Sequence, residues 1–302
     1  MIRYLVKSCL FCGSDGCHDE LYGRNFRDED LNEDVFSARR VTEHYHYRMV
    51  KCRNTGLLFS REILPGDVLE KLYAGGKVTF SAYADIIRKD YWRPLEGMQS
   101  RIGRGAALEI GCSSGFFLEE LQARGFQDVR GCEPSLEAKA IAAPSVRDGM
   151  HTGFFTDGTY PDDSFDLICS FQTLDHLSDP LDILATCYRK LKPGGWIYLI
   201  VHNADGLQAK LFGEKSPIID VEHIYLFNPR TLSLAVEKAG FREPASFPIR
   251  NSYPLEYWAA HAPVPFKKRI LAIMTMTGIG KIAVPLSLGN IGIMARKPLE
   301  AA

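Results

Sequence analysis

The stretch "LEIGCSSGFF" at Leu108–Phe117 predicts a glycine loop between a buried strand and a helix. Apolar residues lead into Gly111, and the run "FFLEELQAR" that follows has the apolar spacing of a helix. Because glycine has no Cβ, Gly111 and Gly115 let the chain bend sharply and let a ligand approach the backbone closely. Loops of this kind usually bind part of a nucleotide.

The residues between the two glycines restrict which nucleotide part fits. A dinucleotide-binding loop would need glycines at 113 and 116, where this chain has Ser113 and Phe116. Phe116 works against close approach of a pyrophosphate to the start of the helix. Glu133 ends the next strand, 22 positions after Gly111, where a carboxylate can accept both ribose hydroxyls. We therefore expect an adenosine without phosphates.

Strand and helix signals alternate over residues 104–205. The strands "AALEI", "VRGCE", "FDLICSF" and "WIYLIV" are separated by helical segments. Ser135 can cap one of these helices, and Asp179 with Pro180 can begin another. This alternation predicts right-handed βαβ units and an α/β fold with a doubly wound, largely parallel sheet.

The overall composition limits the class of protein. The chain has 302 residues, 46% hydrophobic and 24% charged, with a net charge of −1, which is typical of a soluble globular protein. There is no global basic charge to attract nucleic acid. We see no signal peptide and no transmembrane segment. The eight cysteines do not form a secreted disulfide pattern, so we expect a cytoplasmic protein.

At this point the sequence resembles the class I S-adenosylmethionine-dependent methyltransferases. The resemblance rests on "ALEIGCSSGFFLEEL", "GCEPS", "GFFTDGTYPDDSFDLICSFQTLDHLSDPLDIL" and "YRKLKPGGWIYLIVHN", in that order over about 100 residues. The later run "VEHIYLFNPRTLSLAVEKAGF" is also similar to the family. The resemblance implies a Rossmann-like sheet of seven strands whose last strand is antiparallel, with S-adenosylmethionine as methyl donor.

The resemblance also implies which residues bind this cofactor. Glu109 would orient the loop or the methionine ammonium, Glu133 would hold the ribose, and Tyr83 would act as a lid. The other implied cofactor residues are Gly111, Ser113, Gly115, Pro134, Phe154, Phe155, Phe171 and Gln172.

Methyl transfer to a hydroxyl often requires removal of a proton, and histidine is the natural base near neutral pH. His223, beside Glu222, is our first candidate, because the pair resembles the Glu-His pair of certain sugar methyltransferases. His176 in "QTLDHL" is the second. Asp175 stands where the family usually has glutamate, which puts its orienting role in doubt. Both histidines could instead be purely structural.

The amino-terminal "SCLFCGS" has the spacing of a zinc knuckle. Cys9, Cys12 and Cys52 are the expected ligands, but the fourth position of a ribbon is Thr55. Either a surrogate completes a zinc site, or the ribbon is degenerate and metal-free, or the cysteines are incidental. The possible surrogates are Cys17, His18, His44 and His46.

These observations divide the chain into a zinc-ribbon-like segment (1–62), a helical lid or linker (63–103) and a methyltransferase domain (104–302). Residues 104–205 form its cofactor-binding half, and residues 206–302 its acceptor side and last strands. The apolar insert 251–290, with Lys267, Lys268 and Arg269, could pack over the sheet edge, shape the acceptor pocket, form a dimer face or touch a membrane surface.

The function we expect is methyl transfer to a small acceptor, a sugar or nucleotide-sugar hydroxyl or a related glycan, as in polysaccharide biosynthesis. The alternatives are an RNA methyltransferase guided by the ribbon and a non-catalytic cofactor-binding protein. An NAD-dependent oxidoreductase is disfavoured by Ser113 and Phe116. We expect no nucleic-acid partner, because residues 1–62 contain as many acidic as basic side chains.

Overall fold

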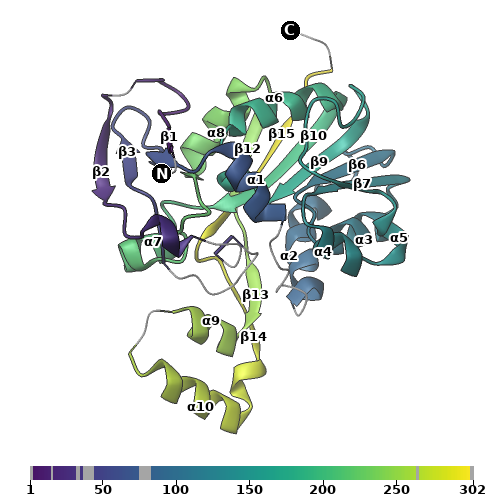
Figure 1. The fold of residues 1–302 in the computed structure, drawn as a ribbon. Helices are drawn as coiled ribbons and strands as arrows, with labels where there is room; N and C mark the ends of the chain where they lie inside the picture. Colours follow the sequence, from purple (N-terminus) through teal and green to yellow (C-terminus); the bar gives the residue numbers. More distant parts are fainter. Residues whose placement is uncertain are drawn as a thin grey trace.

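The computed structural model describes residues 3–14, 16–31, 35–36, 44–74, 83–262 and 265–299. Its centre is a seven-stranded sheet in the order β12-β15-β10-β9-β6-β7-β8 (Figure 1). The strands are β6 (Ala106–Ile110), β7 (Asp128–Glu133), β8 (Met150–Thr152), β9 (Phe165–Phe171), β10 (Leu191–His202), β12 (Arg242–Pro248) and β15 (Asn290–Arg296). The final strand, β15, runs antiparallel to both of its neighbours. The predicted fold class is therefore confirmed.

Helices cover both faces of this sheet (Figure 1). Neighbouring residues of a strand point to opposite faces of the sheet. Ile168 therefore packs in the core on one face, with Leu184 and Leu232. Leu167 packs in the core on the other face, with Phe117. The helices of the first core are α6 (Pro180–Lys190) and α8 (Pro229–Lys238); those near the second are α2 (Ala84–Glu96), α3 (Phe116–Ala123), α4 (Leu136–Ile141) and α5 (Pro144–Arg147).

The predicted helix starts differ in how they are capped. Ser135 accepts a hydrogen bond from the Ala138 N–H and so caps α4 as expected. Pro180 is at the first position of α6, but the Asp179 side chain makes no capping hydrogen bond. Asp179 instead pairs with Lys7 at 3.1 Å, so it ties the amino-terminal segment to the start of α6.

The amino-terminal segment is built into the rest of the chain. Strands β2 (His18–Tyr22), β3 (Met49–Cys52) and β4 (Leu58–Ser60) form one sheet with β11 (Tyr225–Leu226). The short strand β1 (Leu5–Val6) pairs with β5 (Glu62–Ile63), and a 3-10 turn, η1, spans Asp28–Asp30. Apolar residues of this segment share one core with α6 and α8. The described residues of segment 1–62 therefore form no core separate from the rest of the chain.

The expected lid or linker, 63–103, contains α1 (Gly66–Ala74) and α2. Its residues 75–82 lie outside the described residues, as do residues 32–34 and 37–43 of the amino-terminal segment. Leu69 of α1 and Tyr91 of α2 are both buried. These helices therefore pack against the rest of the chain.

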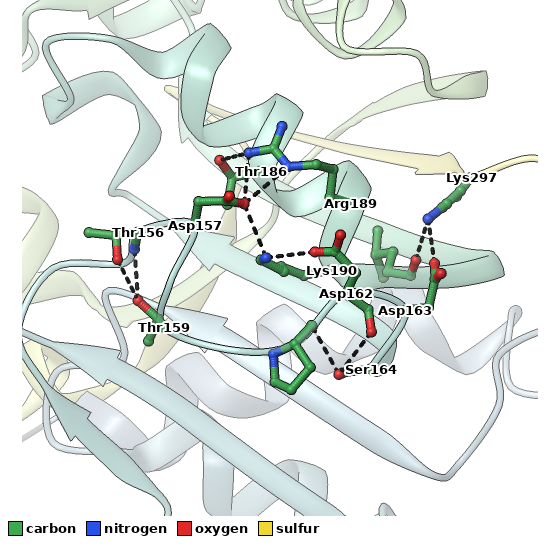
Figure 2. Close-up of polar contacts among 12 residues, drawn as sticks. Thr156, Asp157, Thr159, Asp162, Asp163, Ser164, Thr186, Arg189, Lys190 and Lys297 are labelled. Atoms are coloured by element: carbon green, nitrogen blue, oxygen red, sulfur yellow. Dashed lines mark hydrogen bonds and ion pairs between the residues drawn. The ribbon is translucent and has the colours of Figure 1, made fainter.

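The loop after β8 is fixed by ion pairs to α6 (Figure 2). The buried Lys190 ammonium lies 3.0 Å from Asp157 and 2.6 Å from Asp162. Arg189 pairs with Asp157 at 2.8 Å, and Lys297 pairs with Asp163 at 2.7 Å. The loop that begins with Phe154 and Phe155 is thus held in place from outside the cofactor region.

The insert 251–290 is a hairpin that carries helices. It consists of β13 (Asn251–Pro254), α9 (Leu255–His261), α10 (Lys267–Thr277), η5 (Ile279–Lys281) and β14 (Ala283–Leu286). Its helices lie away from the sheet, at the bottom of Figure 1, rather than over the sheet edge. Because β13 pairs with β14, the insert leaves the sheet as a two-stranded arm. The expectation that these helices cover the sheet edge is wrong.

The remaining short elements surround the carboxyl ends of the strands. They are η3 (Leu174–His176), α7 (Leu207–Phe212) and η4 (Gly213–Lys215). In the described part of the chain, no helix has both the length and the apolar character to cross a membrane.

Candidate active site

A cavity of about 890 Å³ opens at the carboxyl ends of β6, β7, β9 and β10. Ligands bind at this edge in open α/β sheets, where the strand order reverses. The cavity is lined by the glycine loop and by residues of α1, α7 and the base of the insert arm. Its volume is in the range of small-molecule sites.

The glycine loop has the strained backbone that close ligand approach requires. Gly111 has φ +74°, and a Cβ on it would overlap the Thr173 side chain. Ser113 also has a positive φ, +46°, a region that non-glycine residues rarely adopt. Its N–H donates to Glu133 Oε2 at 2.9 Å. Glu133 Oε1 accepts from the Ser135 N–H at the same distance, so both oxygens of this carboxylate are positioned by backbone groups.

Two oxygens in this cavity are buried without a hydrogen-bond partner among the described residues, Glu109 Oε2 and Gln172 Oε1. A buried polar atom without a partner is costly unless a ligand supplies one. Burial and the charge of Glu133 raise the pKa of Glu109 well above its usual range. A positive charge placed beside Glu109 would lower the pKa of this carboxyl again, because it would stabilise the ionised form. Glu109 and Gln172 therefore fit the ammonium and sulfonium charges of S-adenosylmethionine.

Most of the other predicted cofactor residues also line the cavity: Pro134, Phe154, Phe155 and Phe171. Gly115 and Tyr83 are not among its lining residues in the described part of the chain. Gly115 begins α3 with φ +75°. Tyr83 packs edge-on against Tyr253 and Tyr257, so it supports the arm that forms one wall of the cavity.

Three histidines lie together in the wall of the cavity. His202 Nδ1 lies 2.7 Å from Asp175 Oδ2, and its ring centroid lies 4.3 Å from that of His223. The His176 ring packs on the other side of His223, at 4.8 Å. Of the predicted catalytic residues, His223, Glu222 and His176 therefore line one cavity. Asp175, fully buried, orients His202.

Hydrogen bonds and burial determine the tautomer and the charge of the clustered histidines. His223 Nδ1 donates to the Ile218 carbonyl at 3.0 Å, which leaves Nε2 able to accept a proton. Burial and the neighbouring His202 and His176 lower the pKa of His223 well below its usual range. Burial likewise lowers the pKa of His176. Burial alone would raise the pKa of Asp175, but the hydrogen bond from His202 and the nearby imidazoles lower it.

Tyr73 completes this part of the cavity wall. Its hydroxyl lies 3.2 Å from His176 Nδ1. Burial, with the charge of Glu222, raises the pKa of Tyr73, so the phenol stays protonated and can donate a hydrogen bond to His176. Glu222 is half-buried, and its N–H donates to Asp220 Oδ1 at 3.1 Å.

Sequence reasoning missed His202 as a site residue. A signal was present, because His202 ends the strand "WIYLIVH", and ligands bind at the carboxyl ends of parallel strands. Its pairing with Asp175 brings together residues 27 positions apart. That pairing depends on the parallel register of β9 and β10, which the sequence alone does not specify.

The cysteines of the amino-terminal segment form a second cluster. The Sγ of Cys17 lies 3.1 Å from that of Cys12 and 3.4 Å from that of Cys52. Cys9, Cys12 and Cys52 have their sulfurs within 4.8 Å of one another. Thr55 Oγ1 lies 3.4 Å from Cys9 Sγ. Among the expected surrogates, Cys17 is thus beside the other thiols, whereas His46 contacts Glu214.

The strand order, the antiparallel last strand and the cradle around Glu133 together define a class I S-adenosylmethionine-dependent methyltransferase fold. Comparison with known families agrees: residues 95–243, just under half of the chain, match the methyltransferase domain family. Over these residues the chain is therefore similar to a methyltransferase domain.

The chain is similar to curated proteins over the same region. It is 31% identical over 135 residues to the ubiquinone biosynthesis O-methyltransferase of Burkholderia lata, a match that covers 41% of this chain and 53% of that protein. The same-named protein of Burkholderia multivorans is 30% identical with the same coverage. The chain thus spans about half the length of these relatives. The YcgJ protein of Bacillus subtilis has a similar fold, with a TM-score of 0.50, 15% identity, and coverage of 70% of this chain and 100% of that one.

Proposed function

We propose that this protein transfers a methyl group from S-adenosylmethionine to a hydroxyl of a small acceptor. The observation that carries the proposal is the shared cavity, because Glu133 and the three histidines line the same space. When bound, S-adenosylmethionine supplies an electrophilic methyl group whose sulfur leaves as a neutral thioether. Glu133 would hold its ribose, Glu109 and Gln172 would face its positive charges, and Phe154 and Phe155 would contact its adenine.

His223 is our proposed general base. As the acceptor oxygen forms its bond to the methyl carbon, the hydroxyl proton would pass to His223 Nε2. Three features suit His223 to this role. Its lowered pKa keeps the imidazole neutral, so that the ring can accept a proton. The Ile218 carbonyl fixes the tautomer, and the ring lies in the cavity wall. The carboxylate of Asp175 would stabilise the positive charge then shared by the histidine cluster. Glu222 and His176 would position the acceptor or the base.

A sugar hydroxyl is our first candidate for the acceptor. The cavity wall combines the aromatic rings of Tyr253, Tyr257 and Trp258 with the amides of Asn251 and Asn290. Apolar faces with a few polar groups are typical of small-molecule sites. The curated relatives are named as O-methyltransferases of ubiquinone biosynthesis, which favours oxygen as the methylated atom and makes a phenolic hydroxyl the second candidate.

Two measurements test the proposal. Calorimetry should detect S-adenosylmethionine binding to the purified chain, and a screen of activated sugars and phenols with labelled cofactor should identify the acceptor. His223→Gln should then lower kcat by about 10²–10⁴ and leave cofactor affinity unchanged, whereas His151→Gln, an exposed histidine on β8, should not affect turnover. Binding without transfer to any acceptor class would indicate a cofactor-binding protein, and unchanged kcat in His223→Gln would refute the proposed base.

We also propose that the amino-terminal cysteines hold a structural zinc ion, with Cys17 as the fourth ligand in place of Thr55. Tetrahedral ligands with Zn–S distances of about 2.3 Å lie about 3.8 Å apart. The sulfur separations of 3.1–3.8 Å among Cys12, Cys17 and Cys52 are close to this value. A fully thiolate site is typical of structural rather than catalytic zinc.

Metal analysis of the purified chain tests this assignment. We expect about one zinc per chain in the parent protein and in Thr55→Ser, and loss of the metal in Cys17→Ser. Zinc retained at full occupancy in Cys17→Ser would show that Cys17 is not a ligand.

A further inference from the structure

Helix α10 of the insert arm has an unusual environment. All of its eleven residues, Lys267–Thr277, are described, and none is buried. Such a short helix is marginally stable alone, and helices of globular proteins normally bury one apolar face. Its sequence, "KKRILAIMTMT", is nevertheless rich in apolar residues.

The apolar residues of α10 lie on two sides. Ile270, Leu271 and Met274 recur at helical spacing and are half-buried, consistent with the contact between α10 and α9. Ile273 and Met276 are 60% and 87% exposed. They continue into three more exposed side chains, Phe266, Ile279 and Ile282. We call these five exposed residues the arm surface.

Charge around the arm surface is mostly positive. Residues 251–290 contain four cationic side chains, Lys267, Lys268, Arg269 and Lys281, and one carboxylate, Glu256, which lies beside Gly280. The whole chain, in contrast, has a net charge of −1. The arm therefore combines exposed apolar side chains with a local excess of cations, in a protein whose charges otherwise balance.

The arm is directly connected to the cavity wall. The Gln208 N–H of α7 donates to the Leu288 carbonyl at 3.1 Å, which joins α7 to the base of the arm. Leu207 and Leu211 of α7 line the cavity and are 52% and 65% exposed. Apolar side chains thus lie both at the cavity and on the arm beyond it.

We propose that the arm surface docks on an anionic lipid bilayer. Apolar side chains of an interfacial helix enter the boundary between headgroups and acyl chains, and adjacent lysines and arginines are attracted to anionic lipids. Ile273 and Met276 would insert, and Lys267, Lys268 and Arg269 would contact the headgroups. Binding by this route does not depend on methyl transfer and can be measured without an acceptor.

The same features disfavour a second copy of the chain as the occupant. A two-fold contact through the arm surface would place the same patch against itself. Lys267, Lys268 and Arg269 of each copy would then face the arm surface of the other, where residues 265–290 supply no aspartate or glutamate to pair with them. An anionic bilayer offers acyl chains to the apolar residues and negatively charged headgroups to the cationic residues.

Co-sedimentation of the full chain with vesicles tests the proposal. We expect binding to vesicles that contain phosphatidylglycerol, weaker binding to pure phosphatidylcholine, and loss of binding at high salt because the cationic contribution is screened. The double variant Ile273→Ser/Met276→Ser and the triple variant Lys267→Gln/Lys268→Gln/Arg269→Gln should each bind at least about tenfold more weakly. Ile141→Ser, an exposed isoleucine on α4 with 51% of its surface accessible, is the matched control and should bind like the parent.

Two outcomes would overturn the proposal. One is the absence of binding to anionic vesicles at low salt, or equal binding by the parent and the double variant. The other is a concentration-dependent dimer in light scattering that the double variant abolishes while vesicle binding is absent, which would assign the arm surface to self-association. Circular dichroism of each variant checks that the fold is intact.

Discussion

At the scale of single residues, Glu133 shows how the backbone prepares a side chain for its ligand. Both of its oxygens already accept backbone N–H groups, from Ser113 and Ser135. Burial raises the pKa of Glu133, and these two hydrogen bonds oppose that effect. The carboxylate is therefore held in one orientation before any ribose arrives.

Replacing this carboxylate should weaken cofactor binding specifically. We expect Glu133→Gln to raise the Kd for S-adenosylmethionine by about 10- to 100-fold, because a hydrogen bond to a charged group contributes about 1.5–3 kcal/mol. Calorimetric titration measures this change. Glu137→Gln, an exposed residue on α4, is the control, and equal affinities for the two variants would contradict the assignment.

The buried histidines should make stability depend on pH. The pKa of His223 and of His176 is lowered in the folded state, whereas in the unfolded chain it is about 6.5. The unfolded state therefore binds more protons below pH 6.5, so stability is present above this pH and falls as the pH decreases, by up to about 1.4 kcal/mol per pH unit for each proton. Urea unfolding between pH 5 and 8 measures the slope.

A variant separates this contribution from the rest of the protein. His223→Gln should reduce the loss of stability below pH 6.5, and His151→Gln should leave the slope as in the parent. A parent protein whose unfolding free energy is constant between pH 5 and 7 would rule out buried neutral histidines.

At the scale of elements, the loop after β8 depends on α6 for its position. Lys190 is buried and reaches both Asp157 and Asp162 (Figure 2). The two aromatic residues that begin this loop line the cavity. These ion pairs therefore influence the part of the cavity wall that we propose contacts adenine.

Lys190→Met should loosen this loop. We expect a loss of about 1–2 kcal/mol in unfolding free energy, because two carboxylates lose a shared charged donor, and a several-fold higher Kd for the cofactor. Lys192→Met removes a more exposed pair, Lys192 with Asp166 at 2.8 Å, and should cost less than about 1 kcal/mol with unchanged cofactor affinity. Equal cofactor affinity in both variants would contradict the link between loop and site.

At the scale of the whole molecule, the cysteine cluster and the methyltransferase sheet belong to one folding unit. Cys9 and Cys52 lie in the same core as Leu184, Phe227 and Leu232. Strand β11 adds to the amino-terminal sheet, where Tyr225 pairs with Phe59. Loss of the proposed zinc ion should therefore lower the stability of the whole chain.

Metal removal should lower the melting temperature of the entire protein. We expect chelation, or Cys52→Ser, to lower Tm by about 5 °C or more in one cooperative transition, because metal binding contributes directly to folding free energy. Calorimetry with far-ultraviolet circular dichroism follows both parts at once. Two separate transitions, only one of them sensitive to chelator, would indicate independent units.

The sequence by itself determined the fold and several of the residues that line the cavity. Glycine spacing, the acidic end of the second strand and the period of the apolar residues are local properties, so they could be read without contacts. Gly111, Glu133 and Phe155 accordingly lie where the pattern predicts. The antiparallel last strand followed from the same resemblance.

Only the tertiary structure decided which distant residues form the histidine and cysteine clusters and where the insert lies. His202 meets Asp175 because β9 and β10 are in parallel register, Cys17 meets Cys52 because β2 pairs with β3, and the insert stands away from the sheet as an arm. Each of these juxtapositions joins residues distant in the chain. Their positions depend on strand register and packing, which are set by the whole molecule rather than by any local run of residues.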